Sequence, residues 1–173
     1  MKTLDDTHTG SPAAMSMADR WLSTCCTKHT CGAKKATYTP TRLVEILPGQ
    51  TLRLVRAEGA AYVALSHRWG FQQLPTTTTK NVSKRKQGFL RNSLTPTVKD
   101  AISVVQSLGF SYLWIDALCI LQDSDEDWLH EASEMSKVFN NAVLTLAAAD
   151  GDEHSQGMFR HRPENKFLSL IHI

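Results

Sequence analysis

Three short apolar runs, separated by two segments of helical character, constrain the fold of this chain most strongly. The runs are residues 62–66, 112–115 and 142–149. Each is apolar almost throughout, which is typical of strands that are buried on both faces of a parallel sheet. Right-handed crossover helices connect such strands and cover the sheet. The pattern therefore predicts an α/β fold with a mostly parallel sheet and helices on both faces.

The two segments between the three apolar runs carry residues that typically start and stop helices. Thr95 is placed to cap a helix and Pro96 to begin it, and apolar residues then recur at helical spacing up to Gly109. A second helix is predicted from about Asp125 to Asn141. Its acidic first turn suits the positive end of the helix dipole.

A small β-hairpin is predicted ahead of the sheet. Residues 42–46 and 51–55 alternate apolar and polar side chains, and Pro48 and Gly49 lie between them. Alternation on both sides of a Pro-Gly turn is typical of an antiparallel hairpin. We expect this hairpin to be an accessory piece that precedes the main sheet.

The domain boundaries follow from composition. Residues 1–18 are polar, small and aperiodic, so we expect a disordered leader there. A short helix with Trp21 and Leu22 on one side should follow it. A single domain is expected over residues 19–162, with a C-terminal tail at residues 163–173.

Composition narrows the class of protein further. The chain has 173 residues, 42% hydrophobic and 21% charged, as in an ordinary globular domain. No run approaches the roughly 20 apolar residues that a membrane span needs, and the N-terminus lacks the apolar core of a secretory signal. A net charge of +2 does not favour nucleic acid as a partner. We therefore expect a cytoplasmic protein with no membrane span and no nucleic-acid partner.

Polar residues follow two of the predicted strands at the point where each strand ends. In open α/β sheets, ligands bind beyond the carboxyl ends of the strands. If the two strands are close neighbours, these side chains face a common edge. The predicted substrate-binding residues at this edge are Ser66, His67, Arg68, Trp69 and Asp116. The alternative for Trp69 is a core position, where most tryptophans lie.

Glu131 stands out on the second predicted helix. On a helical wheel it falls inside the apolar stripe that Trp128, Met135 and Phe139 define. A carboxyl group in such a stripe is partly desolvated, which raises its pKa and favours acid-base or substrate-binding work. The alternative is that the acids of this region only satisfy the helix dipole, which explains residues 125–127 well and Glu131 poorly.

Two other chemistries find little support in the sequence. Ser66 and His67 are adjacent on a strand and should point to opposite faces, so they do not form a nucleophile–base pair. The group formed by Cys25, Cys26, His29 and Cys31 has no second ligand pair, so we predict no metal site.

The three apolar runs belong to longer motifs. YVALSHRWG, YLWIDALCILQDSDEDWLHEASEM and FNNAVLTLAAADGDEHSQGMF resemble, in order and spacing, the three signature blocks of the fungal heterokaryon incompatibility (HET) domain. The resemblance covers most of the chain, from about Trp21 to Arg162.

The resemblance implies a fungal protein of self/non-self recognition and innate immunity, whose HET domain triggers programmed cell death. HET domains are similar to TIR domains, which have a flavodoxin-like sheet and in some cases hydrolyse NAD with a helix glutamate in a W-x-x-E arrangement. Trp128 to Glu131 has that form, so the resemblance implies Glu131 as catalytic residue, Trp128 as substrate-binding, and NAD as substrate with no cofactor. It also implies homo-oligomers through HET–HET contacts and an upstream immune-receptor protein as partner.

Two alternatives to an enzyme remain open. One is a non-catalytic HET interaction module that assembles a signalling platform. The other is a truncated, inactive paralogue, because Arg68 replaces a small residue that is common before the tryptophan and Leu121 replaces a frequent asparagine.

Overall fold

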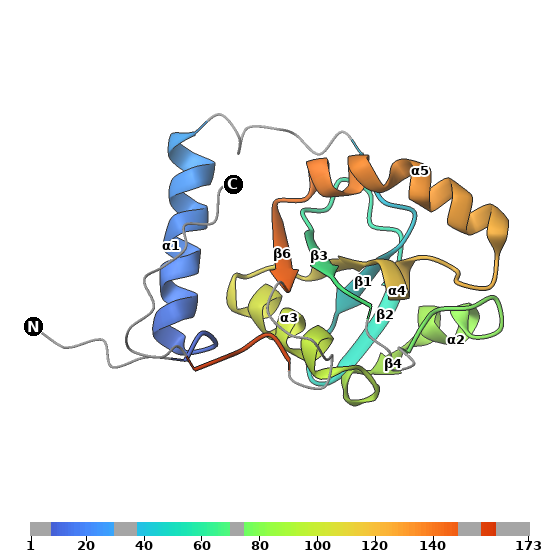
Figure 1. Ribbon diagram of the computed structural model, residues 1–173, viewed down its shortest axis with the longest axis horizontal. Helices are drawn as coiled ribbons and strands as arrows, with labels where there is room; N and C mark the ends of the chain where they lie inside the picture. The colour runs from blue at the N-terminus through green and yellow to red at the C-terminus, as the bar shows by residue number, and fades with distance from the viewer. Residues whose placement is uncertain (1–7, 30–37, 70–74, 149–156, 162–173) are drawn as a thin grey trace, which may run out of the picture.

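A six-stranded sheet forms the centre of the domain (Figure 1). The computed structural model describes residues 8–29, 38–69, 75–148 and 157–161. The strands are β1 (Leu43–Ile46), β2 (Thr51–Val55), β3 (Val63–His67), β4 (Phe89–Leu90), β5 (Tyr112–Ile115) and β6 (Leu144–Ala148). Their order across the sheet is β4-β2-β1-β5-β3-β6. The helices are α1 (Pro12–Lys28), α2 (Val82–Gln87), α3 (Pro96–Ser107), α4 (Asp116–Cys119) and α5 (Asp125–Asn141), with a 3₁₀ turn η2 at Arg91–Ser93.

The sheet is mixed, so the prediction of a mostly parallel sheet was wrong. Among the strands that the structure describes, β3 pairs in parallel with β5 and β6, while β1 runs antiparallel to β2 and to β5, and β2 antiparallel to β4. The hairpin itself was predicted correctly. It is not an accessory piece, however, because Val44 pairs with Leu113 and so joins β1 to the central strand β5.

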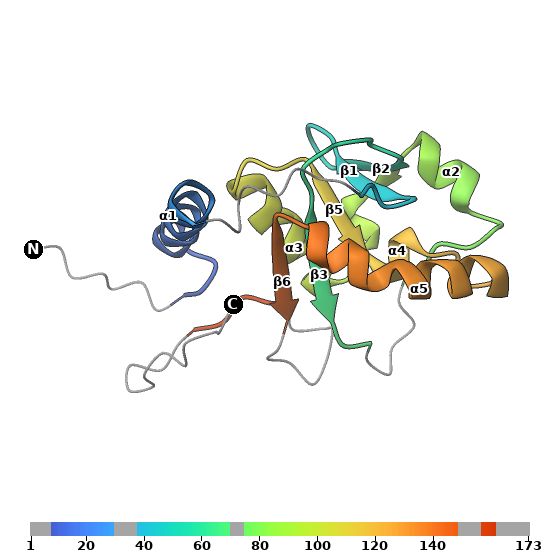
Figure 2. The same cartoon turned by 90° about the horizontal axis from the view of Figure 1, so that it is seen from above.

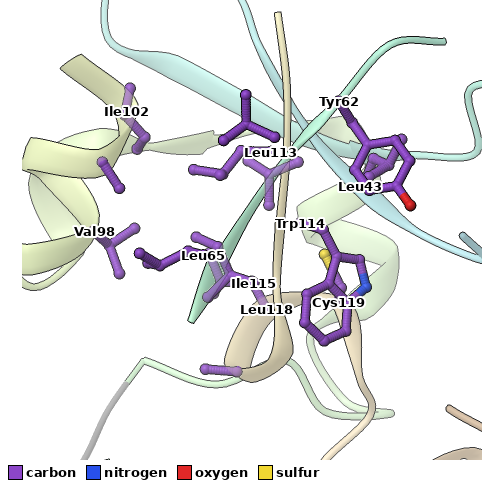
Figure 3. Close-up of a cluster of buried hydrophobic side chains, with 14 of the residues drawn as sticks. Leu43, Tyr62, Leu65, Val98, Ile102, Leu113, Trp114, Ile115, Leu118 and Cys119 are labelled. Carbon is purple, nitrogen blue, oxygen red and sulfur yellow. The ribbon is translucent and has the colours of Figure 1, made fainter. Parts of the chain in front are cut away.

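Helices cover both faces of the sheet, as predicted. Trp114 in β5 contacts Phe139 of α5 edge to face, with ring centroids 5.5 Å apart. Its neighbours Leu113 and Ile115 point to the opposite face, because successive side chains of a strand alternate. On that face Leu113 and Ile115 lie toward α3, and Figure 3 shows them with Ile102 of that helix. All these side chains except Phe139 are buried, and they form the core of the domain.

The predicted start of α3 is confirmed in detail. The Thr95 side chain accepts a hydrogen bond from the backbone N–H of Val98, and Pro96 is the first helical residue. Ala101 and Val105 then extend the buried face that Val98 begins. After the helix ends, Gly109 adopts a φ of +77°, which a residue with a side chain rarely does.

The threonine-rich segment before α2 fixes α4 in place. Thr77 is buried, its N–H donates to Ala117 O at 3.0 Å, and its hydroxyl donates to Leu118 O at 2.6 Å. Gln122 N–H in turn donates to Thr77 O at 2.9 Å. Thr77 therefore binds two residues of the short helix α4 and the chain that follows it.

The first and last described segments pair with each other. Thr9 N–H donates to Arg160 O at 2.9 Å, and Arg160 N–H donates to the Thr9 hydroxyl at 2.8 Å. Gly157 has a φ of +72°, and a Cβ there would lie 2.3 Å from Asp100 Oδ2 in α3. That same oxygen accepts from Met158 N–H at 2.7 Å, so a glycine is needed for this close contact.

The helix α1 stands to one side of the sheet in two perpendicular views (Figures 1 and 2). It begins at Pro12, within the segment that we expected to be a leader, and none of its residues is fully buried. Trp21 is 64% exposed. Residues 1–7 of the expected leader and the expected tail at 163–173 lie outside the described residues. In the part of the chain that the structure describes, every helix is too short or too polar to cross a bilayer.

Candidate functional site

Three of the predicted edge residues meet where the parallel strands end. Asp116 follows β5, and its Oδ2 accepts a hydrogen bond from Trp69 Nε1 at 2.7 Å. His67 is the last residue of β3, and its Nδ1 lies 3.7 Å from Asp116 Oδ1. Since β3 and β5 are parallel neighbours, their carboxyl ends place these side chains together. We call His67, Trp69 and Asp116 the edge cluster.

The edge cluster is partly open to water. Trp69 is 44% exposed and the Asp116 side chain is 26% exposed, whereas the His67 side chain is almost completely buried. Asp116 Oδ1 also accepts from Ala117 N–H at 2.7 Å, which fixes the carboxylate at the start of α4. The result is an oriented carboxylate beside a half-exposed indole ring, an arrangement that can bind hydroxyl groups and stack a flat ring.

Ser66 and Arg68 belong to the same edge but are not part of the cluster. Both are exposed. Successive residues of a strand point to opposite faces, so Ser66 is directed away from the face that His67 uses. The two residues stay predictions for ligand contact.

A second group of charged residues, arranged around Arg42, lies inside the domain. Arg42 immediately precedes β1, and its Nη2 donates to Asp127 Oδ1 at 2.7 Å and to Glu131 Oε1 at 3.3 Å. Nη2 also contacts Asp127 Oδ2, and Nε donates to the Cys119 carbonyl oxygen at the end of α4. We call Arg42, Asp127 and Glu131 the internal ion cluster.

Local sequence explains how α5 presents two acids to one arginine. Ser124 caps the helix, with its Oγ accepting from Asp127 N–H at 3.3 Å. Asp127 and Glu131 are four residues apart and therefore lie on the same helical face. Asp127 Oδ2 accepts a further bond from Leu121 N–H at 2.8 Å. The cluster thus joins the start of β1, the segment after α4 and the first turns of α5.

Glu131 faces inward, as predicted, and is completely buried. Burial raises the pKa of its carboxyl group, and the neighbouring Asp127 raises it further. The Thr41 hydroxyl and the Arg42 guanidinium lower it only in part. Although Thr41 lies close, Glu131 Oε2 has no partner with good hydrogen-bond geometry.

The groups around Glu131 share its shielded environment. Burial, with Glu134 and Glu131 adding to it, raises the pKa of Tyr38 to about 12. Burial also raises the pKa of the Cys119 thiol to about 12, so this cysteine is a small core residue rather than a nucleophile. Thr41 and Arg42 therefore act on Glu131, and Glu131 acts on Tyr38, which belongs to the same short segment.

Trp128 does not share the position of Glu131. We predicted it inside the apolar stripe of α5, but it is 51% exposed, and Leu129 next to it is 64% exposed. The N-terminal turns of α5, to which Trp128 belongs, extend past the strands in Figure 1. The inward face of the helix is instead marked by Glu131 and Val138, which are both buried. Substrate binding by Trp128 stays a prediction.

The two clusters lie at the same end of the sheet. Because β1 is antiparallel to β5, the start of β1 lies beside the end of β5. Asp116 begins α4, and the Cys119 carbonyl that Arg42 contacts ends it. One turn of helix therefore separates the open edge cluster from the closed internal ion cluster.

Sequence reasoning missed Arg42 and Asp127. The pairing of Arg42 with α5 depends on β1 joining β5, which no local pattern indicates. A signal existed for Asp127: two acids four residues apart on a buried helical face need a cation opposite them. Within the described ranges, no group of three or more His, Cys, Asp or Glu side chains is placed to hold a metal ion. Cys31, a member of the cysteine group considered above, lies outside those ranges.

Comparison with known proteins identifies the family. No curated protein and no solved structure matches the chain. A family model described as heterokaryon incompatibility protein (HET) matches residues 62–169, which is more than half of the chain and includes β3, α5 and the acidic residues of both clusters. The chain therefore belongs to the heterokaryon incompatibility (HET) family.

Proposed function

We propose that the chain is an effector domain of heterokaryon incompatibility that cleaves NAD at its nicotinamide–ribose bond, with Glu131 as the catalytic carboxylate. Family membership supports the role in heterokaryon incompatibility. The observation that carries the chemistry is a fully buried glutamate with one unpaired oxygen, close to the edge where the parallel strands end. Functional sites concentrate acids of this kind.

The proposed reaction is a hydrolysis. The N-glycosidic bond breaks, and neutral nicotinamide leaves with the bonding electron pair. The ribose C1′ then carries oxocarbenium-like positive charge, which an anionic Glu131 stabilises, as carboxylates do in glycoside cleavage. Water adds to C1′ and releases a proton, so the second product is ADP-ribose.

The edge cluster supports the binding of such a substrate. The half-exposed face of Trp69 suits stacking of an aromatic ring. Asp116 has a partly exposed carboxylate that can accept hydrogen bonds from ribose hydroxyls. The exposed guanidinium of Arg68 suits the pyrophosphate.

The proposal requires a rearrangement around Glu131. In the structure its side chain is 1% exposed and contacts Arg42, so a ribose cannot reach the carboxylate directly. We propose that self-association of the domain supplies this change. Activity is therefore expected in the assembled protein and not in the dilute monomer.

A non-catalytic interaction module is the second candidate, and the exposed residues of α5 favour it. Trp128 and Leu129 present adjacent apolar side chains to solvent at the start of the helix. Such residues are typical anchors of protein–protein contacts. In this case Glu131 serves to hold α5 on β1, and the exposed face of α5 makes the HET–HET contact.

Incubation with NAD separates the two candidates. The purified protein is incubated with NAD when dilute and under crowding, and released nicotinamide is quantified by chromatography. The enzyme proposal predicts release by the crowded wild type, loss of release in Glu131→Gln, and no loss in the matched control Glu134→Gln, whose carboxylate pairs with exposed Lys137 on the same helix.

The opposite outcome is equally defined. A wild type that assembles, as measured by sedimentation, without releasing nicotinamide excludes the enzyme and favours the interaction module. Replacing Trp128 and Leu129 by serine would then abolish assembly while leaving cooperative unfolding intact. Assembly unaffected by these substitutions excludes α5 as the contact face.

A further inference from the structure

Segment 38–42 precedes the region that matches the family and nevertheless encloses Glu131. The match begins at residue 62, whereas Tyr38, Thr41 and Arg42 all influence the carboxyl group of Glu131 or are influenced by it. Arg42 supplies the one guanidinium of the internal ion cluster and faces two carboxylates. The cation and the hydroxyl group that act on this acid therefore come from outside the matched segment.

The two acids hold Arg42 unequally. Asp127 contacts the guanidinium through both carboxylate oxygens and receives a further hydrogen bond from Leu121 N–H. Glu131 makes a single, longer contact of 3.3 Å through Oε1, and its Oε2 is unpaired. Asp127 is thus held by three hydrogen bonds, and Glu131 by one hydrogen bond and the nearby Thr41 hydroxyl. When the cluster opens, Glu131 is the member expected to move.

We propose that Arg42 is a positioning residue that controls whether Glu131 is available to a ligand. With Arg42 engaged, Glu131 is sealed between α5 and β1. When the Glu131 contact is lost, Arg42 stays on Asp127 and the glutamate side chain turns outward. The inference rests on the proposed function only in that a ligand must reach Glu131.

Physical chemistry explains why loss of this contact uncovers the acid. A buried carboxylate without a cation is strongly disfavoured, so it either takes up a proton or moves into water. Solvent is close, since Trp128, Leu129 and His130 immediately before it are all exposed. A rotamer change of Glu131, without unfolding of α5, is sufficient to reach it.

Carbodiimide labelling of carboxyl groups tests the proposal without reference to any activity. The full chain is labelled in the presence of an amine, and the modification of Glu131 is measured by peptide mass spectrometry. Exposed Glu126 in the same helix serves as the internal reference. In the wild type, we expect Glu131 to react at least tenfold more slowly than Glu126.

Substitutions move the labelling rate in opposite directions. Arg42→Gln is expected to bring Glu131 close to the rate of Glu126, and Arg42→Lys to give an intermediate rate because the planar fork is lost but the charge stays. Asp127→Asn frees Arg42 for Glu131 and is expected to slow its labelling further. The matched control is Arg53→Gln, which removes an exposed ion pair with Glu45 on the neighbouring strands.

Each outcome decides one question. If Arg42→Gln folds, an unchanged labelling rate of Glu131 in it overturns the proposal. If Arg42→Gln does not fold, equal labelling rates of Glu131 in the wild type, Arg42→Lys and Asp127→Asn overturn it. Nicotinamide assays on the same samples separate the two proposals. If the labelling of Glu131 changes with Arg42 but no nicotinamide is released, only the proposed NAD cleavage is refuted. If nicotinamide is released but the labelling of Glu131 does not change with Arg42, only this inference is refuted.

Discussion

The edge cluster and the internal ion cluster use the same kind of group, a carboxylate, in opposite surroundings. The side chain of Asp116 is 26% exposed and is oriented by an indole N–H, a backbone N–H and a nearby imidazole. The side chain of Glu131 is 1% exposed and contacts a guanidinium. One turn of helix, α4, separates the two surroundings.

The difference shows how one end of a sheet can hold one carboxylate that water reaches and another that it does not. Charges interact weakly where water reaches them and much more strongly where it does not. A ligand can therefore meet Asp116 without any movement of the protein, whereas Glu131 becomes available only when its ion pair is broken. The following predictions test this contrast between the clusters.

The largest expected effect concerns Cys119, which borders the internal ion cluster. Its thiol pKa of about 12 implies a thiolate fraction roughly 10³-fold lower at pH 8 than that of an ordinary cysteine. We expect labelling by a thiol reagent to be slower than at exposed Cys26 by at least that factor. Mass spectrometry of the two peptides measures the ratio. Comparable rates would show that the interior beside Glu131 is open to solvent.

Arg42→Gln comes next in size. The substitution leaves the buried carboxylate of Glu131 and the partly buried carboxylate of Asp127 without their cation. Loss of the partner of a buried charge typically costs about 3–5 kcal/mol of unfolding free energy. Urea denaturation followed by circular dichroism measures the loss. Arg53→Gln, at an exposed pair, should cost less than about 1 kcal/mol. Equal losses for the two variants would contradict the distinction between closed and open ion pairs.

The pH dependence of stability provides a third test. Because the pKa of Glu131 is raised by burial, the folded chain binds this proton more tightly than the unfolded chain does. The associated stabilisation is fully present below the unfolded pKa and is lost as pH rises through the folded pKa. When the pH is lowered from 7 to 5, the unfolding free energy of the wild type should therefore increase relative to that of Glu131→Gln.

Urea titrations of both proteins at the two pH values measure this difference. Asp123, whose pKa is lowered by hydrogen bonds from Thr79, acts in the opposite direction but is present in both proteins and cancels. A constant difference between wild type and Glu131→Gln at pH 7 and pH 5 would show that Glu131 is not desolvated.

Asp116→Asn should have the smallest effect. The amide oxygen can still accept from either Trp69 Nε1 or Ala117 N–H, so one of these hydrogen bonds and the partly exposed contact with His67 are lost. We expect a loss of about 1 kcal/mol of unfolding free energy. The same urea titration applies. A loss as large as that of Arg42→Gln would mean that the edge cluster is structural and not a site for ligands.

Local patterns in the sequence were sufficient for much of the fold. The cap at Thr95, the hairpin around Pro48 and Gly49 and the buried strand at residues 112–115 depend on near neighbours, and the structure confirms each of them. The sequence also indicated that His67 lies beside Asp116, because neighbouring parallel strands end at a common edge. The inward orientation of Glu131 followed from helical spacing alone.

Features that depend on long-range pairing were not predictable from the sequence. The antiparallel contact of Val44 with Leu113 joins segments about 70 residues apart, and it decides both the mixed sheet and the position of Arg42. Helical spacing also placed Trp128 in the core, since the wheel carries no information on where the sheet beneath the helix ends. The chemistry of either cluster stays a proposal, because geometry does not by itself identify a reaction.

The central place of β1 has a practical consequence for work with shorter versions of this protein. An expression fragment that starts where the family match starts, at residue 62, would lack β1 and β2 and leave one side of β5 without a hydrogen-bonding neighbour. Bare edges of apolar strands such as Leu113–Ile115 recruit other chains and promote aggregation. Such a fragment would also leave Asp127 and Glu131 without Arg42, the cation that both of them contact. A usable truncation therefore has to retain the chain from Tyr38 onward.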